Sequence, residues 1–105
     1  MGKINDWRSP TLTEAVKIWT GWGREFKPCR DDSILMNHFG DKIASELLSI
    51  VKFLAVEYDA SEAKYTAPNL VEMGRLASED FRRKYPEIPD EIVQALEWCY
   101  TFDYK

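Results

Sequence analysis

Histidine is nearly absent from this sequence, in which His38 is the single example among 105 residues. Catalysis by a histidine needs a nucleophile or an acid beside it, and the nearby candidates, Cys29 and Asp41, belong to no recognisable motif. A helical ribonuclease of the histidine-dependent kind has an arginine a few residues before its histidine, whereas Arg30 lies eight positions before His38. We therefore predict a protein that is not an enzyme and has no catalytic residue. An enzyme centred on His38 is the least favoured alternative.

Metal ligands and phosphate-binding loops are also scarce. The two cysteines, Cys29 and Cys99, are far apart in the chain, and the sequence contains neither a CxxC pair nor a Glu-x-x-His motif. Gly21 and Gly23 are isolated glycines rather than a glycine-rich loop. We predict no metal and no cofactor. We expect both cysteines to be reduced, with Cys29 in a loop and Cys99 in the core, and a disulfide between them is the minor alternative.

Long hydrophobic runs and an excess of positive charge are missing as well. The longest apolar stretch, residues 47–56, is interrupted by Ser49 and Lys52 and is far too short to span a bilayer. A net charge of −4 and a pI near 5.0 argue against direct binding to nucleic acid or to an anionic membrane. The first ten residues lack the apolar core of a signal peptide. We expect the protein to be cytoplasmic.

The sequence does contain a helical periodicity of apolar residues along its whole length. We predict an all-α fold in which residues 1–105 form a compact single-domain bundle of four main helices plus one short helix. The main helices are expected over residues 11–20, 41–58 and 89–102, and from a start between residues 66 and 69 to residue 85. The short helix is expected over 34–39. Residues 23–30 are expected to form a loop, and residues 59–67 a connection or a single helical turn.

Polar residues mark where these helices are expected to begin. Thr11 and Asn69 are each followed three positions later by a glutamate, which is the spacing of a capping box. Asp32 or Ser33 is expected to cap the short helix, and Asp41 the longest one. Gly74 lies inside a predicted helix, where it costs about 1 kcal/mol relative to alanine, a cost that a close helix crossing would offset.

Three tryptophans precede residue 23. Trp19 lies on the apolar stripe of the first predicted helix, and we expect it in the core. Two roles are open to Trp7 and Trp22, because each side chain could pack on the core or contact a partner.

Negative charge is concentrated in residues 86–104, which contain five acidic residues and no lysine or arginine. Residues 1–85 contain 13 acidic and 13 basic residues, so the negative charge arises entirely in this C-terminal stretch. The stretch also contains four alternating aromatic residues, Trp98, Tyr100, Phe102 and Tyr104. Aromatic side chains beside unpaired acids suit contact with a basic partner.

In a helix the four aromatic residues separate into two pairs at i, i+4 spacing. We expect Trp98 and Phe102 to lie on the core face, and Tyr100 and Tyr104 to lie at its margin, where each phenol can meet water or a partner. Two interpretations of the tyrosine pair remain open. The tyrosines could simply cover the edge of the core, or they could form an exposed pair within an acidic surface.

These features predict a small acidic protein-binding inhibitor. The best match is an immunity or antitoxin-type protein that neutralises a basic toxin domain, most plausibly a nuclease, by masking its active site. A nuclease is basic where it holds phosphates, so an acidic inhibitor is steered towards that surface. The alternative is a helical adaptor or regulatory subunit, monomeric or homodimeric, with no toxin partner. The expected partner-binding residues are Glu87, Asp90, Glu97, Tyr100, Asp103 and Tyr104.

Overall fold

The computed structural model describes residues 7–105, and these residues contain helices and no strand. This confirms the all-α prediction with four main helices and one short helix, and the connection after the longest helix contains one further helical turn. The expectation that the N-terminus is not a signal peptide rests largely on residues 1–6, which lie outside the described residues. The helices are α1 (Pro10–Thr20), α2 (Asp32–Phe39), α3 (Asp41–Asp59), α4 (Ala63–Thr66), α5 (Leu70–Lys84) and α6 (Asp90–Asp103).

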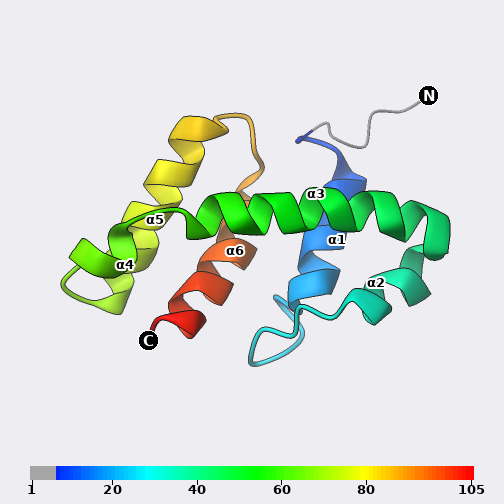
Figure 1. Cartoon of the computed structure of the whole chain (residues 1–105), viewed down its shortest axis with the longest axis horizontal. Coiled ribbons are helices and arrows are strands. Elements are labelled where there is room, and N and C mark those ends of the chain that lie inside the picture. The colour runs from blue at the N-terminus through cyan, green and yellow to red at the C-terminus, as the bar shows by residue number, and fades with distance from the viewer. Residues whose placement is uncertain (1–6) are drawn as a thin grey trace.

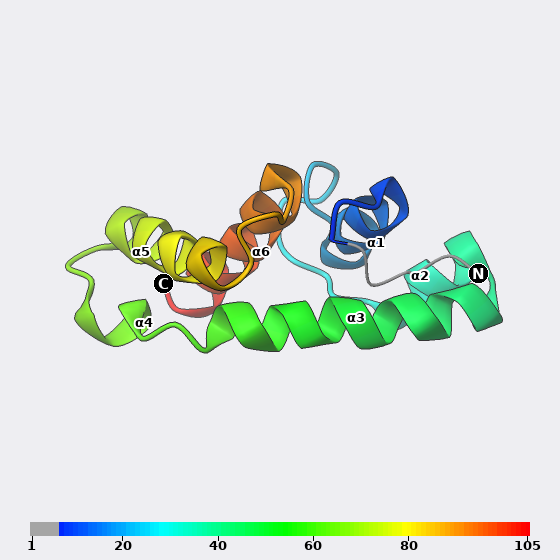
Figure 2. The same ribbon diagram turned by 90° about the horizontal axis from the view of Figure 1, so that it is seen from above.

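The helices form two layers. Helix α3 runs across the molecule, and α1, α6 and α5 lie side by side against one of its faces, crossing its direction (Figure 1). Seen from above, α3 forms a layer of its own, with α2 near its start and α4 beyond its end (Figure 2). The described chain measures 43 × 27 × 18 Å along its principal axes. Because α6 contacts both α1 and α5, it is the middle helix of its layer, with α1 on one side and α5 on the other.

The core lies between these two layers. Helix α3 contributes a stripe at helical spacing, with Leu47, Val51 and Leu54 fully buried and Tyr58 almost so. The other helices contribute apolar faces that meet this stripe in one continuous cluster. Its further members include Leu12, Val16, Trp19, Leu35, Phe81, Ile92 and Tyr100.

The helix starts confirm one predicted cap and correct three. Asn69 caps α5 as expected, because its side chain accepts a hydrogen bond of 2.9 Å from the amide of Glu72. Helix α1 begins two residues earlier than the Thr11 cap requires, because Pro10 suits the first helical position after Ser9. Asp31, rather than Asp32 or Ser33, caps α2. At α3, Gly40 is the cap residue and Asp41 lies in the first turn.

Gly74 lies at a close crossing of α5 and α6, as its position inside a helix indicated. A Cβ atom at Gly74 would stand 2.5 Å from Oε2 of Glu97, so any larger residue at this position would displace the carboxylate. The other carboxylate oxygen of Glu97 accepts a hydrogen bond of 3.1 Å from Ser78, and Ser78 Oγ lies 2.7 Å from the hydroxyl of Tyr58. This short network joins α3, α5 and α6 inside the molecule.

The three tryptophans all contact the core. Trp19 is buried as predicted, and its indole Nε1 donates a hydrogen bond of 2.9 Å to Asp32, which ties α1 to α2. Trp7 and Trp22 are half-buried and pack against the core from outside. The ring of Trp7 meets Tyr85 edge-on, with 5.4 Å between the ring centroids. Core packing thus accounts for much of the surface of all three.

Candidate functional site

The six predicted partner-binding residues do not share one surface. Asp90 opens α6 and Asp103 closes it, and the two are thirteen positions apart along the helix, a distance of about 20 Å. Glu87 precedes the helix and lies near Asp90, at the end away from Asp103. Glu97 lies midway, against Gly74 of α5. Only Tyr100, Asp103 and Tyr104 gather at the C-terminal end of the helix.

The acids of residues 86–104 are mostly paired with bases from other parts of the chain. Asp90 Oδ1 lies 3.0 Å from Arg82, and Glu91 Oε2 lies 3.3 Å from Lys17. Asp103 accepts two hydrogen bonds, of 2.7 and 2.8 Å, from the guanidinium of Arg30. The expectation of an unpaired acidic surface along this stretch is therefore wrong. Among the described residues, Glu87 is the one acid of the stretch without an ion-pair or hydrogen-bond partner in its side chain.

Tyr100 is buried, with 2% of its surface exposed, so its expected place at the margin is wrong. Its hydroxyl donates a hydrogen bond of 3.0 Å to the carbonyl of Ser61 and accepts one of 3.0 Å from the amide of Lys64. These backbone groups belong to the segment around α4, which covers this side of α6. Tyr100 therefore stabilises the fold, and it supports rather than forms a contact surface.

Tyr104 occupies the margin as predicted, with 39% of its surface exposed. Its hydroxyl donates a hydrogen bond of 2.8 Å to Asp59 at the end of α3, and its ring packs on Tyr100 with centroids 5.0 Å apart. The hydrogen bond to the Asp59 carboxylate raises the pKa of the phenol to about 12. Tyr104 is thus a fixed, partly exposed aromatic residue.

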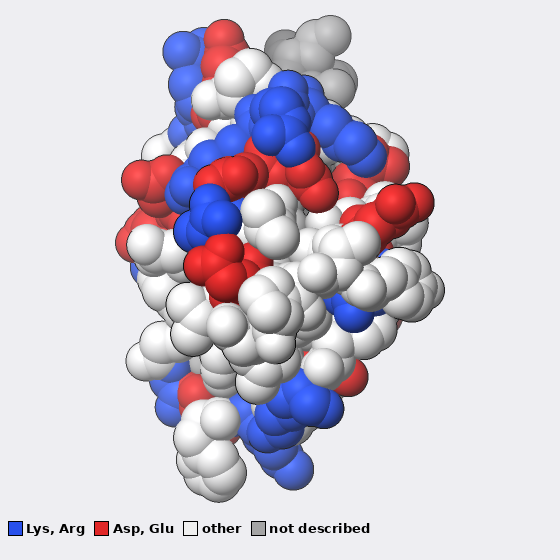
Figure 3. Space-filling model, turned by 90° about the vertical axis from the view of Figure 1, so that its left-hand side faces the viewer, with Lys and Arg blue, Asp and Glu red and all other residues white. Residues whose placement is uncertain are grey.

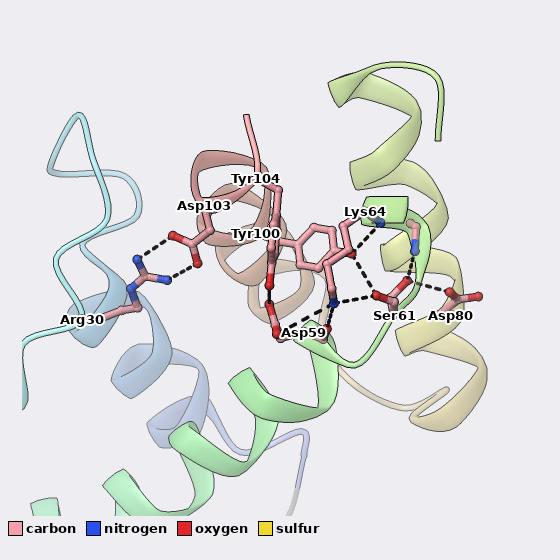
Figure 4. Close-up of polar contacts among 9 residues, drawn as sticks. Arg30, Asp59, Ser61, Lys64, Asp80, Tyr100, Asp103 and Tyr104 are labelled. Atoms are coloured by element: carbon pink, nitrogen blue, oxygen red, sulfur yellow. Dashed lines mark hydrogen bonds and ion pairs between the residues drawn. The ribbon is translucent and has the colours of Figure 1, made fainter. Parts of the chain in front are cut away.

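Lys64 lies beside the two tyrosines, on the side away from Arg30 (Figure 4). Its ammonium lies 5.5 Å from the centre of the Tyr100 ring and 5.2 Å from that of Tyr104, close enough for cation–π attraction. It also donates hydrogen bonds to the backbone carbonyls of Asp59 and Ser61. Only 11% of this side chain is exposed. Lys64 therefore fixes the segment after α3 to the C-terminal end of α6.

A pocket of about 380 Å³ lies between α1, α3 and α6, and Tyr100 and Tyr104 form part of its lining. Its inner surface is apolar and aromatic, and its polar lining residues are one guanidinium, two carboxylates and the phenol of Tyr104. Figure 4 shows Arg30 paired with Asp103 beside Tyr104 and Asp59. We call this the tyrosine pocket; it is lined by Trp19, Arg30, Ala55, Val56, Tyr58, Asp59, Leu96, Cys99, Tyr100, Asp103 and Tyr104.

Two buried groups at this pocket make the fold sensitive to alkaline pH. Burial raises the pKa of the Cys99 thiol to about 11, and burial also raises the pKa of the Tyr58 phenol above its usual range. In the unfolded chain both groups ionise at lower pH. The contribution of Cys99 to stability is therefore complete below about pH 8 and is lost as pH rises towards 11, whereas the contribution of Tyr58 begins to be lost only above about pH 10.

We expect the free energy of unfolding to fall between pH 8 and 10, with Cys99 accounting for about 1 kcal/mol of that loss at pH 10. Urea titrations at the two pH values measure it. Cys99→Ala should show a smaller loss than the wild type, whereas Cys29→Ala, which changes the exposed cysteine, should lose as much as the wild type. An equal loss in wild type and Cys99→Ala would contradict the assignment.

The opposite flank of α6 carries a second depression, of about 470 Å³. Trp98 and Phe102 lie here half-buried and outside the core cluster, so their expected place in the core is wrong. The start of α5 borders this flank at Leu70 and Val71 without fully burying the pair, while Val93 and Tyr100 face the core instead. Seen from the end where α4 and α5 lie, a broad uncharged area separates Lys and Arg residues above and below it (Figure 3). We call this depression the apolar groove; it is lined by Phe26, Leu70, Val71, Glu97, Trp98, Thr101, Phe102 and Lys105.

His38 lies at a third depression, a cleft of about 930 Å³ between α1, α2 and the start of α6. Its Nε2 atom stands 3.2 Å from Glu14, with both side chains about half exposed. Lys17 and Arg24 line the same cleft. Of the described residues lining it, none is Cys29 or Asp41, the two candidates that the sequence placed near His38.

Across residues 7–105, no three His, Cys, Asp or Glu side chains gather in a way that could hold a metal ion. In the same range, none of the helices combines the length and the hydropathy that crossing a lipid bilayer requires.

Sequence reasoning missed three residues of the tyrosine pocket region, namely Arg30, Asp59 and Lys64. Arg30 has a positive φ of 50° in the loop before α2, which brings a residue far from α6 in the chain against Asp103. Asp59 and Lys64 lie in the segment expected only to connect two helices. Their spacing around Ser61 gives no pattern that distinguishes them from other surface charges.

Compared with models of known protein families, with curated proteins and with solved structures, the chain gives no match.

Proposed function

We propose that the protein binds and blocks another protein, as a cytoplasmic immunity or antitoxin-type inhibitor of a basic toxin domain, specifically a nuclease. The observation that carries the proposal is the tyrosine pocket, a concave surface with an aromatic interior and carboxylates among its lining. Protein interfaces concentrate their binding energy in such pockets, where one side chain of the partner is fully desolvated.

Charge supports a basic partner. Two carboxylates and one guanidinium leave the lining of the pocket with one net negative charge, and the whole chain carries −4. Asp59 is only partly used within the chain, because its Oδ1 accepts one hydrogen bond from Tyr104 and its Oδ2 stays 3.9 Å from Lys64. The long-range field would speed encounter, and Asp59 would receive a hydrogen-bond donor of the partner.

Two exposed side chains would supply the apolar contact. Val56 and Tyr104 stand at the pocket with 66% and 39% of their surfaces exposed. Tyr104 is held by Asp59 and by the ring of Tyr100, so little conformational freedom would be lost when a partner packs on it. By binding the nuclease through this pocket, the protein would cover the basic residues with which the nuclease holds phosphates.

The proposal is tested by capturing the partner on the immobilised protein and then titrating the captured partner's nuclease activity with free protein. We expect stoichiometric inhibition. Tyr104→Ala should speed dissociation about tenfold or more, because a partly buried aromatic contact is lost. Asp59→Lys should mainly slow association, and the difference from wild type should shrink in high salt. Surface plasmon resonance separates the two rates.

Glu87→Lys is the matched control for Asp59→Lys. It makes the same change of charge beyond the far end of α6 and should bind nearly like the wild type. Equal weakening by both substitutions would show that net charge alone matters and would remove the pocket from the interface. Capture of a partner that is not a toxin domain would refute the inhibitor function and leave the helical adaptor as the better description.

A further inference from the structure

The loop between α1 and α2 presents an aromatic side chain directly to solvent. Phe26 has 95% of its surface exposed, the highest value among the large hydrophobic residues of the described chain. Figure 1 shows this loop projecting from the body of the molecule on the side where α6 ends. An exposed phenylalanine forgoes roughly a tenfold to hundredfold gain in an equilibrium constant that burial would give.

The loop is held at both of its ends. The amides of Arg24 and Glu25 donate to the carbonyl of Gly21, at 3.0 and 2.8 Å, and the amide of Cys29 donates to Thr20 at 2.9 Å. At the far end, Arg30 is fixed by its two hydrogen bonds to Asp103. Phe26 is therefore displayed by a structured loop, and little ordering would be needed when it meets a partner.

Phe26 stands beside a surface into which such a side chain fits. The apolar groove, whose lining includes Phe26 itself, is open, and its Val71 is 78% exposed. At about 470 Å³ the groove has room for a phenylalanine side chain. A protruding aromatic residue and a groove for one thus occupy adjacent places on one face.

We propose that this face is the interface of a homodimer, in which a two-fold axis inserts Phe26 of each copy into the apolar groove of the other. A two-fold interface brings one surface against itself, so the surface must contain both the inserted side chain and its receptor. The charges fit the same occupant. The lining of the groove contains one carboxylate, Glu97, and one ammonium, Lys105, so opposite signs can pair between copies, whereas a partner of one sign would meet both attraction and repulsion.

This dimer is independent of the inhibitor function. The apolar groove and the tyrosine pocket lie on opposite flanks of α6, and their lining residues do not overlap. A dimer formed through the groove leaves both tyrosine pockets open. Each dimer would then offer two identical sites for the partner.

Sedimentation velocity of the purified protein from 1 to 200 μM tests the proposal. We expect a concentration-dependent monomer–dimer equilibrium. Phe26→Glu and Val71→Glu should each weaken it by about 100-fold or more, because every substitution in a two-fold interface removes two contacts. Val56→Glu is the matched control, since it makes the same change at an exposed valine outside the groove, and it should leave the dimer unchanged.

Each other outcome overturns the proposal. A protein that stays monomeric at 200 μM has no such interface, and its groove is then free for a different partner. A dimer that tolerates Phe26→Glu and Val71→Glu uses another surface. A dimer weakened equally by Val56→Glu responds to charge alone, and growth beyond dimers excludes the closed two-fold arrangement. Thermal melting of each variant confirms that it remains folded, and partner capture by a monomeric variant tests the inhibitor function separately.

Discussion

Replacing Tyr100 with alanine is expected to lower the free energy of unfolding by about 3–5 kcal/mol, the loss typical of a large buried aromatic residue. The side chain is almost fully buried, its ring packs against Tyr58 with centroids 5.3 Å apart, and its hydroxyl bonds two backbone groups of the segment around α4. Urea denaturation followed by circular dichroism measures the change.

Tyr104→Ala is the natural comparison, because the same residue type lies one helical turn later on the same side of α6. Its exposed ring and single hydrogen bond to Asp59 predict a loss of only about 1 kcal/mol. Tyr100→Phe isolates the hydroxyl and should cost about 1–3 kcal/mol, since it leaves the amide of Lys64 and the carbonyl of Ser61 without this partner. Similar losses for Tyr100→Ala and Tyr104→Ala would show that Tyr100 is not buried in solution.

Trp19→Ala is expected to be about as damaging, with a loss of about 3–5 kcal/mol. Trp19 projects from α1 into the core and lines the tyrosine pocket, and its indole Nε1 donates a hydrogen bond to Asp32 at the start of α2. The substitution would therefore leave a cavity and remove a tie between two helices. Because the same side chain lines the pocket, we also expect partner binding to fall at temperatures where the variant remains folded.

Trp22→Ala serves as the control for Trp19→Ala. Trp22 is half-buried at the surface of the core, so its removal should cost clearly less, about 1–2 kcal/mol. Trp19→Phe retains most of the apolar contact and loses the hydrogen bond to Asp32, and it should fall between the two. If Trp22→Ala lowered the free energy of unfolding as much as Trp19→Ala, the assignment of Trp19 to the core and of Trp22 to its surface would be wrong.

The helices could be predicted because their signals are local. Apolar residues at helical spacing define each element, and the side chain of Asn69 reaches an amide only three residues away. The cap of α1 lies two residues before the predicted Thr11, because two local signals compete there, the Thr11 capping pattern and the preference of Pro10 for the first helical position. Even this error is small, since both signals point to the same helix.

The faces of α6 could not be predicted from the helix alone. The pair Trp98 and Phe102 and the pair Tyr100 and Tyr104 lie on either side of the same apolar stripe, and the pattern within α6 does not say which flank is covered. That choice depends on the segment around α4, which offers Tyr100 the carbonyl of Ser61 and the amide of Lys64. Polar partners far away in the chain therefore outweigh the greater hydrophobicity of the other pair.

The charges of residues 86–104 show the same limitation. Counted along the sequence, the acids have no neutralising neighbours, yet Lys17, Arg30 and Arg82 reach Glu91, Asp103 and Asp90 in the folded chain. Exposed pairs of this kind contribute little stability each, but they remove most of the local field that the sequence suggested. The acidic character that remains is a property of the whole molecule.

The place of α6 in its layer also sets the order in which the protein can fold. Helix α1 lies beside α6 in that layer, yet nearly seventy residues separate the end of one from the start of the other. During synthesis, α1 therefore stays without this neighbour until residues 90–103 have emerged. Joining segments so distant in the chain costs loop-closure entropy before the contacts form, so core closure is expected to follow translation of α6 rather than to accompany the growing chain.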